Sequence, residues 1–310
     1  MSIDVVAPGI LTTVQDPLGR RDWRHVGVPE GGAADPWSAR LANRLVGNPD
    51  GDALLELTLA GPTLSFIDAA VVALVGEMTA TLDGLPLRPP AAHAVRAGAQ
   101  LRVEGGRDAR AYLAIGGGLE VERLLGSSAT DLRSGFGGLD GRALRAGDRL
   151  THGAATGPGF RWLGADRAGP IRIVAGPHPG IERLTDGTWR IGAEADRAGV
   201  RLDGPTLQAA VDGVPSMGLP LGAIQLPPDG RPIVMLADRP VTGGYPVPAV
   251  VVGADIGRVA RLRPGDEVRF ASVSLDEARS ALRRAEEELA ALEALEAPGD
   301  DELGWVGSHR

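Results

Sequence analysis

The stretch GAIQLPPDGRPIVMLADRPVTGGYPVPAVVV, residues 222–252, decides the fold that this sequence predicts. Two apolar runs, 223–226 and 232–237, flank a Pro-Pro-Asp-Gly turn. Because the prolines fix φ at the start of the turn and Gly230 can adopt a positive φ, the pattern predicts a β-hairpin that pairs Gln225 with Ile233. A plain core hairpin with polar ends is the simpler explanation, because turn chemistry accounts for every Gly and Pro. The polar residues that interrupt it are candidates for a binding surface: Gln225, Asp238, Arg239, Thr242 and Tyr245.

Short β-rich runs, separated by Gly, Pro and Asp, fill the chain from Leu54 onward, for example VVALVG (71–76) and RAYLAI (110–115). Strands at this spacing, with almost no helix between them, predict a mainly β barrel or sandwich rather than a doubly wound α/β sheet. Few helices are expected. One begins at Asp35 and ends at the Gly-Asn-Pro sequence 47–49, and a longer one begins at a Ser-x-x-Glu capping box.

A segment rich in Gly and Ala, residues 151–170, marks the expected boundary between two similar halves. Gly-Pro-Thr-Leu occurs at 61–64 and again at 204–207, and Leu-Arg-x-Gly-Asp at 144–148 and again at 262–266, in the same order in both halves. The expected organisation is a first β-barrel over 1–160, a second over 161–273, a C-terminal helix over 274–297 and a flexible tail over 298–310.

The composition excludes several kinds of site. All 32 basic residues are arginine, so the chain has neither a Schiff-base lysine nor a P-loop lysine. It has no cysteine, its five histidines are widely separated, and no metal site is expected. The glycine run 116–118 lacks a following helical pattern, which argues against a dinucleotide fingerprint. A net charge of −8 and an aromatic content of 4% argue against partners such as nucleic acid or an anionic membrane. Without a secretory signal or a membrane-spanning run, a cytoplasmic location is expected.

Polar residues alone leave the chemistry open. Segment 127–134 groups several hydroxyls around one arginine, which could hold a carboxylate or phosphate or form a solvated loop. Asp16 with Asp35, or Glu56 with Asp238, could serve as a general acid and base, but the sequence gives no distance within either pair.

Several long motifs in a fixed order resemble the biotin-dependent carboxyltransferase family. That family includes the C-type subunit of 5-oxoprolinase, the sporulation regulator KipA, proteins like allophanate hydrolase subunit 2, and one half of the urea carboxylase carboxyltransferase domain. The opening motif is GILTTVQDPLGRRDWRHVGVPEGGAADPWSARLANRLVGNPDGDALLELTLAGPTLSF, residues 9–66. The later ones are GSSATD (126–131), GRALRAGDRL (141–150), ADRAGVRLDGP (195–205), GAIQLPPDGRPIVMLADRPVTGGYP (222–246) and LRPGDEVRF (262–270).

The resemblance implies two tandem cyclophilin-like β barrels and a protein that works in a heteromeric complex. It implies the C-type subunit of an ATP-dependent 5-oxoprolinase, which opens a small-molecule lactam, 5-oxoproline, to L-glutamate together with a KipI-like B-type subunit and an A-type subunit. ATP would then be bound at the level of the complex. Two alternatives stay open. One is the carboxyltransferase half of a urea carboxylase-like system, with biotin supplied by a partner because this chain has no lysine to carry it. The other is a KipA-like regulatory protein without catalysis.

The resemblance also implies site residues, carried over position by position. The catalytic candidates are Asp16, Asp35, Glu56, Gln225 and Tyr245. The substrate-binding candidates are Gln15, Arg20, Asn43, Asp238, Thr242, Gly243 and Gly244. The chain departs from the family pattern in two places. It has Gly31-Gly32-Ala33-Ala34-Asp35 where Ser-Gly-Ala-Met-Asp is common, which removes a hydroxyl, and His178 where glutamine is frequent.

Overall fold

The structure is a computed structural model that describes residues 1–88, 90–155, 157, 159–162, 164, 168–208 and 214–294. The described residues form two compact units. Unit 1 takes its residues from Met1–Gly19, Pro36–Gly164 and Glu288–Arg310, and unit 2 from Arg20–Asp35 and Ala165–Glu287. Segment Arg20–Asp35 therefore belongs to unit 2, although unit 1 precedes and follows it in the sequence. Domains at 1–160 and 161–273 stay a prediction.

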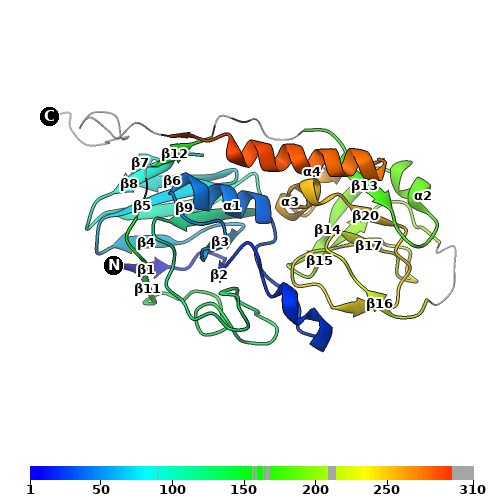
Figure 1. Ribbon diagram of the computed structural model, residues 1–310, viewed down its shortest axis with the longest axis horizontal. Coiled ribbons are helices and arrows are strands. Elements are labelled where there is room, and N and C mark those ends of the chain that lie inside the picture. The colour runs from blue at the N-terminus through cyan, green and yellow to red at the C-terminus, as the bar shows by residue number, and fades with distance from the viewer. Residues whose placement is uncertain are drawn as a thin grey trace. The chain divides into compact units, whose positions relative to one another are not determined.

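Two antiparallel sheets make up most of unit 1 (Figure 1). Their strands are β1 (Ser2–Ala7), β2 (Leu11–Gln15), β3 (Leu54–Thr58), β4 (Thr63–Phe66), β5 (Ala70–Val75), β6 (Met78–Leu82), β7 (Leu85–Pro86), β8 (Ala92–Val95), β9 (Gln100–Gly106), β10 (Arg110–Ile115) and β11 (Arg149–Thr151). One sheet has the order β11-β1-β4-β9-β6-β7, and the other has the order β2-β3-β10-β5-β8.

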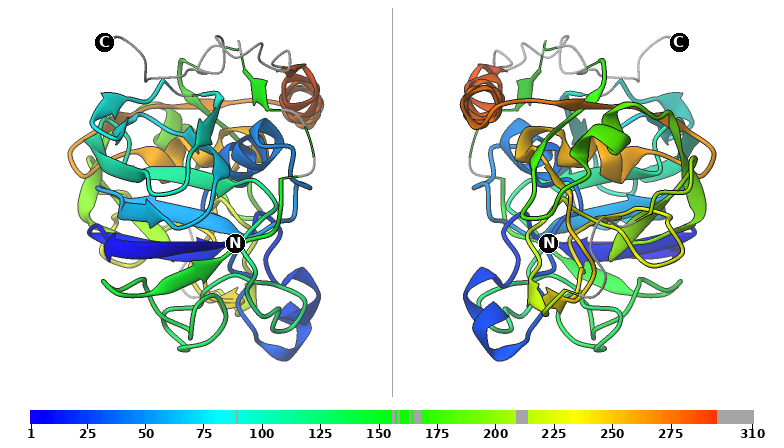
Figure 2. Two further views of the ribbon diagram at one scale, coloured as in Figure 1. Left: turned by 90° about the vertical axis from the view of Figure 1, so that its left-hand side faces the viewer. Right: turned by 90° about the vertical axis from the view of Figure 1, so that its right-hand side faces the viewer.

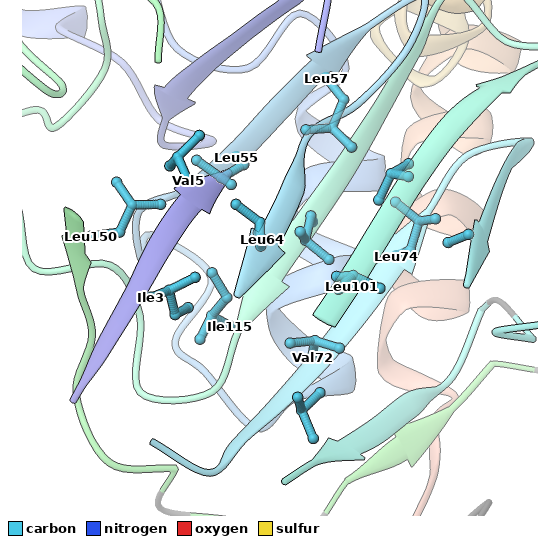
Figure 3. Close-up of a cluster of buried hydrophobic side chains, with 14 of the residues drawn as sticks. Ile3, Val5, Leu55, Leu57, Leu64, Val72, Leu74, Leu101, Ile115 and Leu150 are labelled. Carbon is cyan, nitrogen blue, oxygen red and sulfur yellow. The ribbon is translucent and has the colours of Figure 1, made fainter. Parts of the chain in front are cut away.

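Apolar side chains from both sheets form the core of unit 1 (Figure 3). Alternate residues point into it, since successive side chains of a strand lie on opposite faces. In β3, for example, Leu55 and Leu57 belong to the core, whereas Glu56 lies on the other face. That second face of the five-stranded sheet is covered by α1 (Pro36–Leu45), which packs on β3, β5 and β10. The predicted helix before the Gly-Asn-Pro sequence is therefore confirmed.

Unit 2 is an eight-stranded barrel. Its strands are β13 (Ile171–Ala175), β14 (Trp189–Ala195), β15 (Gly199–Asp203), β17 (Ala223–Gln225), β18 (Ile233–Met235), β20 (Ala249–Val251), β21 (Glu267–Val268) and β22 (Phe270–Ser272). They follow the order β21-β14-β15-β18-β17-β20-β13-β22. The two outermost strands, β21 and β22, are separated only by Arg269, whose carbonyl oxygen accepts a hydrogen bond of 2.8 Å from the backbone N–H of Ile171. One stretch of chain thus joins both ends of the sheet, and the curled sheet can be followed in Figures 1 and 2.

The remaining elements of unit 2 surround the barrel or connect its strands. Strands β16 (Met217–Gly218) and β19 (Thr242–Gly243) pair as a small separate sheet. The short helices are η1 (Arg21–Val26), α2 (Ile181–Thr185), η2 (Gly253–Asp255) and α3 (Ile256–Arg261). The barrel core includes Trp189, Ile224 and Val234, all fully buried. A mainly β protein with few short helices was predicted, and the structure confirms this.

The hairpin predicted in 222–252 is present. Gln225 of β17 pairs with Ile233 of β18, the register that the sequence predicts. In the turn, Gly230 has φ of 74° and its backbone N–H donates to the carbonyl of Pro227 at 3.0 Å. The turn chemistry therefore sets which face of the barrel Gln225 occupies.

The repeated Leu-Arg-x-Gly-Asp sequences fold alike in the two units. In each, the Asp carboxylate accepts a 2.7 Å hydrogen bond from the backbone N–H three residues before it. The glycine has a positive φ in each, 89° at Gly147 and 93° at Gly265. The N–H of Gly147 donates to β1, which pairs with β11, the strand that follows the turn. The N–H of Gly265 likewise donates to β14, which pairs with β21, the strand that follows the second turn. This match supports the interpretation of the two halves as related.

The C-terminal helix α4 (Leu275–Ala290), lengthwise in Figure 1 and end-on in Figure 2, begins at the predicted capping box. Ser274 Oγ accepts from the backbone N–H of Glu277 at 3.2 Å, and the Glu277 carboxylate accepts from the backbone N–H of Ser274 at 2.8 Å. The helix is shorter than the predicted range 274–297, because β23 (Glu293–Ala294) is extended and pairs with β12 (Phe160–Arg161). The expected tail at 298–310 lies outside the described residues. Among the described helices, none combines the length and the apolar character that a membrane span requires.

Candidate functional site

The centre of the candidate site in unit 2 is the side chain of Gln225. It ends strand β17 and is only 4% exposed. Its amide nitrogen Nε2 is buried and has no hydrogen-bond partner among the described residues. A buried amide left unsatisfied costs roughly 1–3 kcal/mol, so such a group is a candidate for completing a ligand's hydrogen bonds.

Residues 242–245 lie beside this amide. A Cβ built on Gly243 would lie 2.5 Å from Gln225 Nε2 and 2.7 Å from Leu219 Cδ1, so only glycine fits there without displacing a side chain. Thr242 and Gly244 are exposed, and Tyr245 is 43% exposed. The structure thus brings Gln225 and Gly243 together and leaves the neighbouring residues open to solvent.

Substitution Gly243→Ala should displace Gln225 while leaving the fold intact. Because the new Cβ meets the ends of two flexible side chains, we expect a loss of about 1–2 kcal/mol in the free energy of unfolding. Gly218→Ala is a matched control, because Gly218 lies in the partner strand and a Cβ there meets no atom within 4 Å. Denaturant unfolding of both variants checks this, and equal losses would contradict the contact between Gly243 and Gln225.

Asp238 is held by an arginine that the sequence analysis did not identify. Arg197 donates through Nε to Asp238 Oδ2 at 2.8 Å and through Nη2 to Oδ1 at 2.9 Å. The same Nη2 donates to the carbonyl of Gly32 at 2.6 Å. A Cβ on Gly31 would lie 3.2 Å from Arg20 Nη1 and 3.9 Å from Asp238 Oδ1. Arg20 and Asp238 therefore approach the same glycine of segment Arg20–Asp35, where the family sequence commonly has serine.

Asp35 lies against helix α3. Its carboxylate is so close to Gly257 that a Cβ on this glycine would clash with it, and Arg261 Nε lies 3.4 Å from Asp35 Oδ2. His178, the other departure from the family pattern, accepts a hydrogen bond at Nδ1 from the backbone N–H of Val247 at 3.0 Å. With Nδ1 as the acceptor, the neutral ring carries its proton on Nε2.

In unit 1, Asp16 accepts four hydrogen bonds. Oδ1 accepts from the backbone N–H groups of Leu18 at 3.0 Å and Gly19 at 2.7 Å. Oδ2 accepts from Ser127 Oγ at 2.5 Å and from the backbone N–H of Ser128 at 2.7 Å. The loop at Ser127 and Ser128 thus holds the carboxylate of Asp16, and the binding of a ligand carboxylate or phosphate by segment 127–134 stays a prediction.

Gln15 and Glu56 lie on the second face of the five-stranded sheet. Gln15 Nε2 donates to Thr13 Oγ1 and to the carbonyl of Thr130, both at 3.1 Å, whereas its buried Oε1 has no partner among the described residues. Thr13 is paired in register with Glu56, and Glu56 Oε2 accepts from Tyr112 Oη at 2.9 Å. This face therefore carries a buried polar cluster that includes one unsatisfied acceptor.

Asn43 of α1 ties the helix to the loop that follows it. Its Nδ2 donates to the carbonyl of Asp52 at 2.9 Å, and its Oδ1 accepts from Asn48 Nδ2 at 3.3 Å. These bonds use both ends of the amide, which indicates a structural contribution. In the described part of the chain, no group of three or more His, Asp or Glu side chains could hold a metal ion.

The two predicted acid pairs each combine one residue of unit 1 with one of unit 2. Asp16 and Glu56 belong to unit 1, and Asp35 and Asp238 belong to unit 2. Both pairings therefore stay predictions. The contacts of Arg197 could not have been found in the sequence, because it bonds to residues 41 and 165 positions away.

Comparison with known proteins identifies the family. Residues 26–272 match the family described as "Carboxyltransferase domain, subdomain A and B". The chain is 35% identical over 291 residues to the C-type subunit of 5-oxoprolinase from Escherichia coli, covering 90% of this chain and 94% of that protein. It is 32% identical over 332 residues to urea amidolyase of Lachancea kluyveri, covering 95% of this chain but 18% of that protein.

A solved structure shows the same fold. The crystal structure of the Kluyveromyces lactis urea carboxylase superposes with a TM-score of 0.86 at 31% identity, over 93% of this chain and 29% of that chain. The chain thus spans less than a third of the urea carboxylase and nearly all of the oxoprolinase subunit. The matched residues include both copies of the repeated turn and the whole hairpin around Gln225. This chain belongs to the carboxyltransferase family that comprises subdomains A and B.

Proposed function

We propose that this protein is the C-type subunit of an ATP-dependent 5-oxoprolinase complex, which opens 5-oxoproline to L-glutamate. The observation that carries the proposal is the end-to-end match with the Escherichia coli protein, which covers 90% of this chain and 94% of that one. The urea amidolyase match, in contrast, covers only 18% of its protein, so most of that protein has no counterpart here.

The geometry around Gln225 suits a lactam. A lactam carbonyl oxygen accepts hydrogen bonds, and the buried Gln225 amide offers an N–H without a partner among the described residues. The amide packs directly against Gly243, and exposed Tyr245 offers a phenol that could orient the ring nitrogen. In our proposal Gln225 and Tyr245 contact the substrate, with Thr242, Gly243 and Gly244 lining its place.

The residues of unit 1 take supporting roles in this proposal. Asp16 already accepts four hydrogen bonds, and Asn43 uses both ends of its amide, so each holds a loop in place. Gln15 and Glu56 lie in the buried polar cluster, where the unsatisfied Gln15 Oε1 could accept a hydrogen bond from a bound N–H or O–H group. Catalytic roles for Asp16, Asp35 and Glu56 stay predictions.

We assign ATP to the complex rather than to a glycine-rich loop of this chain. The glycine run 116–118 is used for packing: Cβ atoms on Gly117 and Gly118 would clash with Gly153 and Asp52. The N–H of Gly117 donates to Asn48 Oδ1 at 2.7 Å and is therefore not available to a phosphate. Without a lysine, the chain also lacks the P-loop cation.

The proposed reaction consumes two water molecules. Transfer of the terminal phosphoryl group of ATP to the lactam oxygen releases ADP and makes the ring carbon electrophilic. Water adds to that carbon, the ring C–N bond breaks and the nitrogen takes up a proton. A second water then releases phosphate and leaves glutamate. We place the A-type and B-type subunits, which complete the enzyme, with this chain in the cytoplasm, where ATP is available.

A second candidate is the carboxyltransferase half of a urea carboxylase-like system. It is favoured by the TM-score of 0.86 with the Kluyveromyces lactis urea carboxylase. In that case a partner must supply carboxybiotin, because biotin is carried on lysine and this chain has none.

Co-expression with the products of neighbouring genes separates the candidates. We expect a complex with the A-type and B-type subunits that releases glutamate from 5-oxoproline only when ATP is present. Urea carboxylation with a carboxybiotin donor and no glutamate would favour the second candidate instead. A stable complex that is inactive in both assays would favour a KipA-like regulatory protein and contradict our proposal.

A further inference from the structure

Three arginine side chains of unit 2 converge on a single carboxylate. Arg21 Nε lies 3.3 Å from Glu30 Oε1, and Arg24 Nη1 lies 3.6 Å from Glu30 Oε2. Arg239 Nη2 donates to the same Oε2. Three positive charges thus surround one negative charge, and the group, which we term the Glu30 cluster, has an excess of positive charge.

Arg239 is the structural member of the Glu30 cluster. It is 2% exposed, and it donates through Nε to the carbonyl of Leu219 at 2.9 Å and through Nη1 to that of Leu236 at 3.3 Å. Burial lowers the pKa of Arg239; the bond to Glu30 opposes this, and the charges of Arg24 and Arg21 lower the pKa further. The repulsion from these neighbours means that Glu30 does not neutralise the group.

Arg21 and Arg24 are the accessible members. The Arg21 side chain is 60% exposed, and its terminal nitrogens Nη1 and Nη2 have no hydrogen-bond partner within the described ranges. Arg24 is 28% exposed and donates through Nη2 to the carbonyl of Leu219 at 2.6 Å. A guanidinium group with free N–H donors, as in Arg21, is well suited to bind a carboxylate, which it can hold by two parallel hydrogen bonds, and Arg24 adds its positive charge.

Leu219 joins the Glu30 cluster to the Gln225 site. Its carbonyl oxygen accepts from Arg24 and Arg239. Its Cδ1 lies 2.7 Å from the position of a Cβ on Gly243, and Gln225 Nε2 lies 2.5 Å from that same position. One residue thus borders both the excess positive charge and the unsatisfied buried amide.

We propose that Arg21 and Arg24 bind the carboxylate of the substrate while Gln225 donates to its lactam oxygen. This inference rests on the proposed function, and it adds the element that selects the substrate. In 5-oxoproline the carboxylate is attached to the ring carbon next to the lactam nitrogen, so one small molecule presents both groups to neighbouring sites. Urea and simple lactams have no carboxylate, so the Glu30 cluster adds nothing to their binding affinity.

Substitution Arg21→Gln tests this selection in the assembled complex. Titration calorimetry without ATP should show the affinity for 5-oxoproline, relative to that for 2-pyrrolidinone, falling by about 10-fold, because a charge-assisted hydrogen bond is lost. Arg21→Lys should restore part of the preference, since it keeps the charge without the planar fork. Arg269→Gln is the matched control, because Arg269 is 65% exposed and paired with one glutamate, as Arg21 is.

Three results would overturn the inference. The preference could stay unchanged in Arg21→Gln, or fall equally in the Arg269→Gln control. Alternatively, steady-state kinetics could show a higher KM for ATP and an unchanged KM for 5-oxoproline, which would assign the cluster to a phosphate. If the wild-type complex binds 5-oxoproline in an Arg21-dependent way but forms no glutamate, the inference stands and the proposed function fails. If the wild-type complex binds neither 5-oxoproline nor 2-pyrrolidinone, both the inference and the proposed function fail.

Discussion

Substitution Asp16→Ala is expected to lower the free energy of unfolding by about 3–5 kcal/mol, because it removes a buried carboxylate from several donors at once. The carboxylate is 3% exposed and accepts from two backbone N–H groups of its own turn, and from one backbone N–H and one hydroxyl of the loop at Ser127–Ser128. The substitution leaves these donors buried and unsatisfied. Denaturant unfolding followed by circular dichroism measures the loss.

Asp131→Ala is a matched control for Asp16→Ala. Asp131 is 6% exposed, and from the described residues its Oδ1 accepts only the two turn bonds, from the backbone N–H groups of Arg133 at 3.0 Å and Ser134 at 2.9 Å. We expect Asp131→Ala to lower the free energy of unfolding by about 1–2 kcal/mol, since Asp131 lacks the second pair of donors that Asp16 has. If Asp16→Ala kept wild-type stability and abolished activity, Asp16 would act in catalysis and our structural assignment would be wrong.

Substitution Asp255→Ala is the second change with a large expected effect. Asp255 is fully buried, and Arg172 donates to it through Nη2 at 2.6 Å and through both Nε and the backbone N–H at 2.8 Å. These bonds tie η2 to strand β13 of the barrel. Because removal of one partner leaves the other charge without its ion pair, we expect the free energy of unfolding to fall by about 3–5 kcal/mol. Asp276→Ala, which changes an exposed side chain of helix α4, should be close to neutral.

The pH dependence of the free energy of unfolding tests the contribution of the Asp255 carboxylate separately. Burial alone would raise the pKa of Asp255, but hydrogen bonds from the side chain and backbone of Arg172, with the charge of Arg258, hold it below its usual value. A lowered pKa in the folded state gives stability that is complete above the unfolded pKa of about 4 and is lost as the pH falls through the folded pKa. Asp255→Ala should therefore lose less stability than wild type between about pH 5 and pH 2. If wild type and Asp255→Ala lost the same free energy of unfolding over this pH range, Asp255 would not have the lowered pKa assigned to it.

Local chemistry made much of the fold predictable. The Pro-Pro-Asp-Gly turn fixed the pairing of Gln225 with Ile233, and the capping box placed the start of α4. Both features depend on residues close together in the sequence. Closure of the barrel through Arg269 depends on distant strands, and only the structure reveals it.

The candidate site was less predictable, because its contacts join distant residues. The Asp16 carboxylate is held by a serine 111 positions away, and Arg24 donates to a carbonyl 195 positions away. Nothing near Arg20–Asp35 in the sequence indicates that this segment packs with unit 2. The interrupted apolar pattern supplied Gln225 as a candidate, and the resemblance to the family added Gly243. The structure supplied the reason to join them, an unsatisfied amide beside a glycine that leaves it room.

The most direct test of the account is the rate of ATP-dependent glutamate release from 5-oxoproline by the assembled complex carrying Gln225→Ala. We predict a loss of about 10–100-fold relative to wild type, because the hydrogen bond that positions the lactam oxygen for phosphorylation disappears. Gln208→Ala, an exposed glutamine of the same unit, should retain the wild-type rate. Wild-type glutamate release by an intact Gln225→Ala complex would contradict the assignment of Gln225, and no release by the wild-type complex would contradict the proposed function itself.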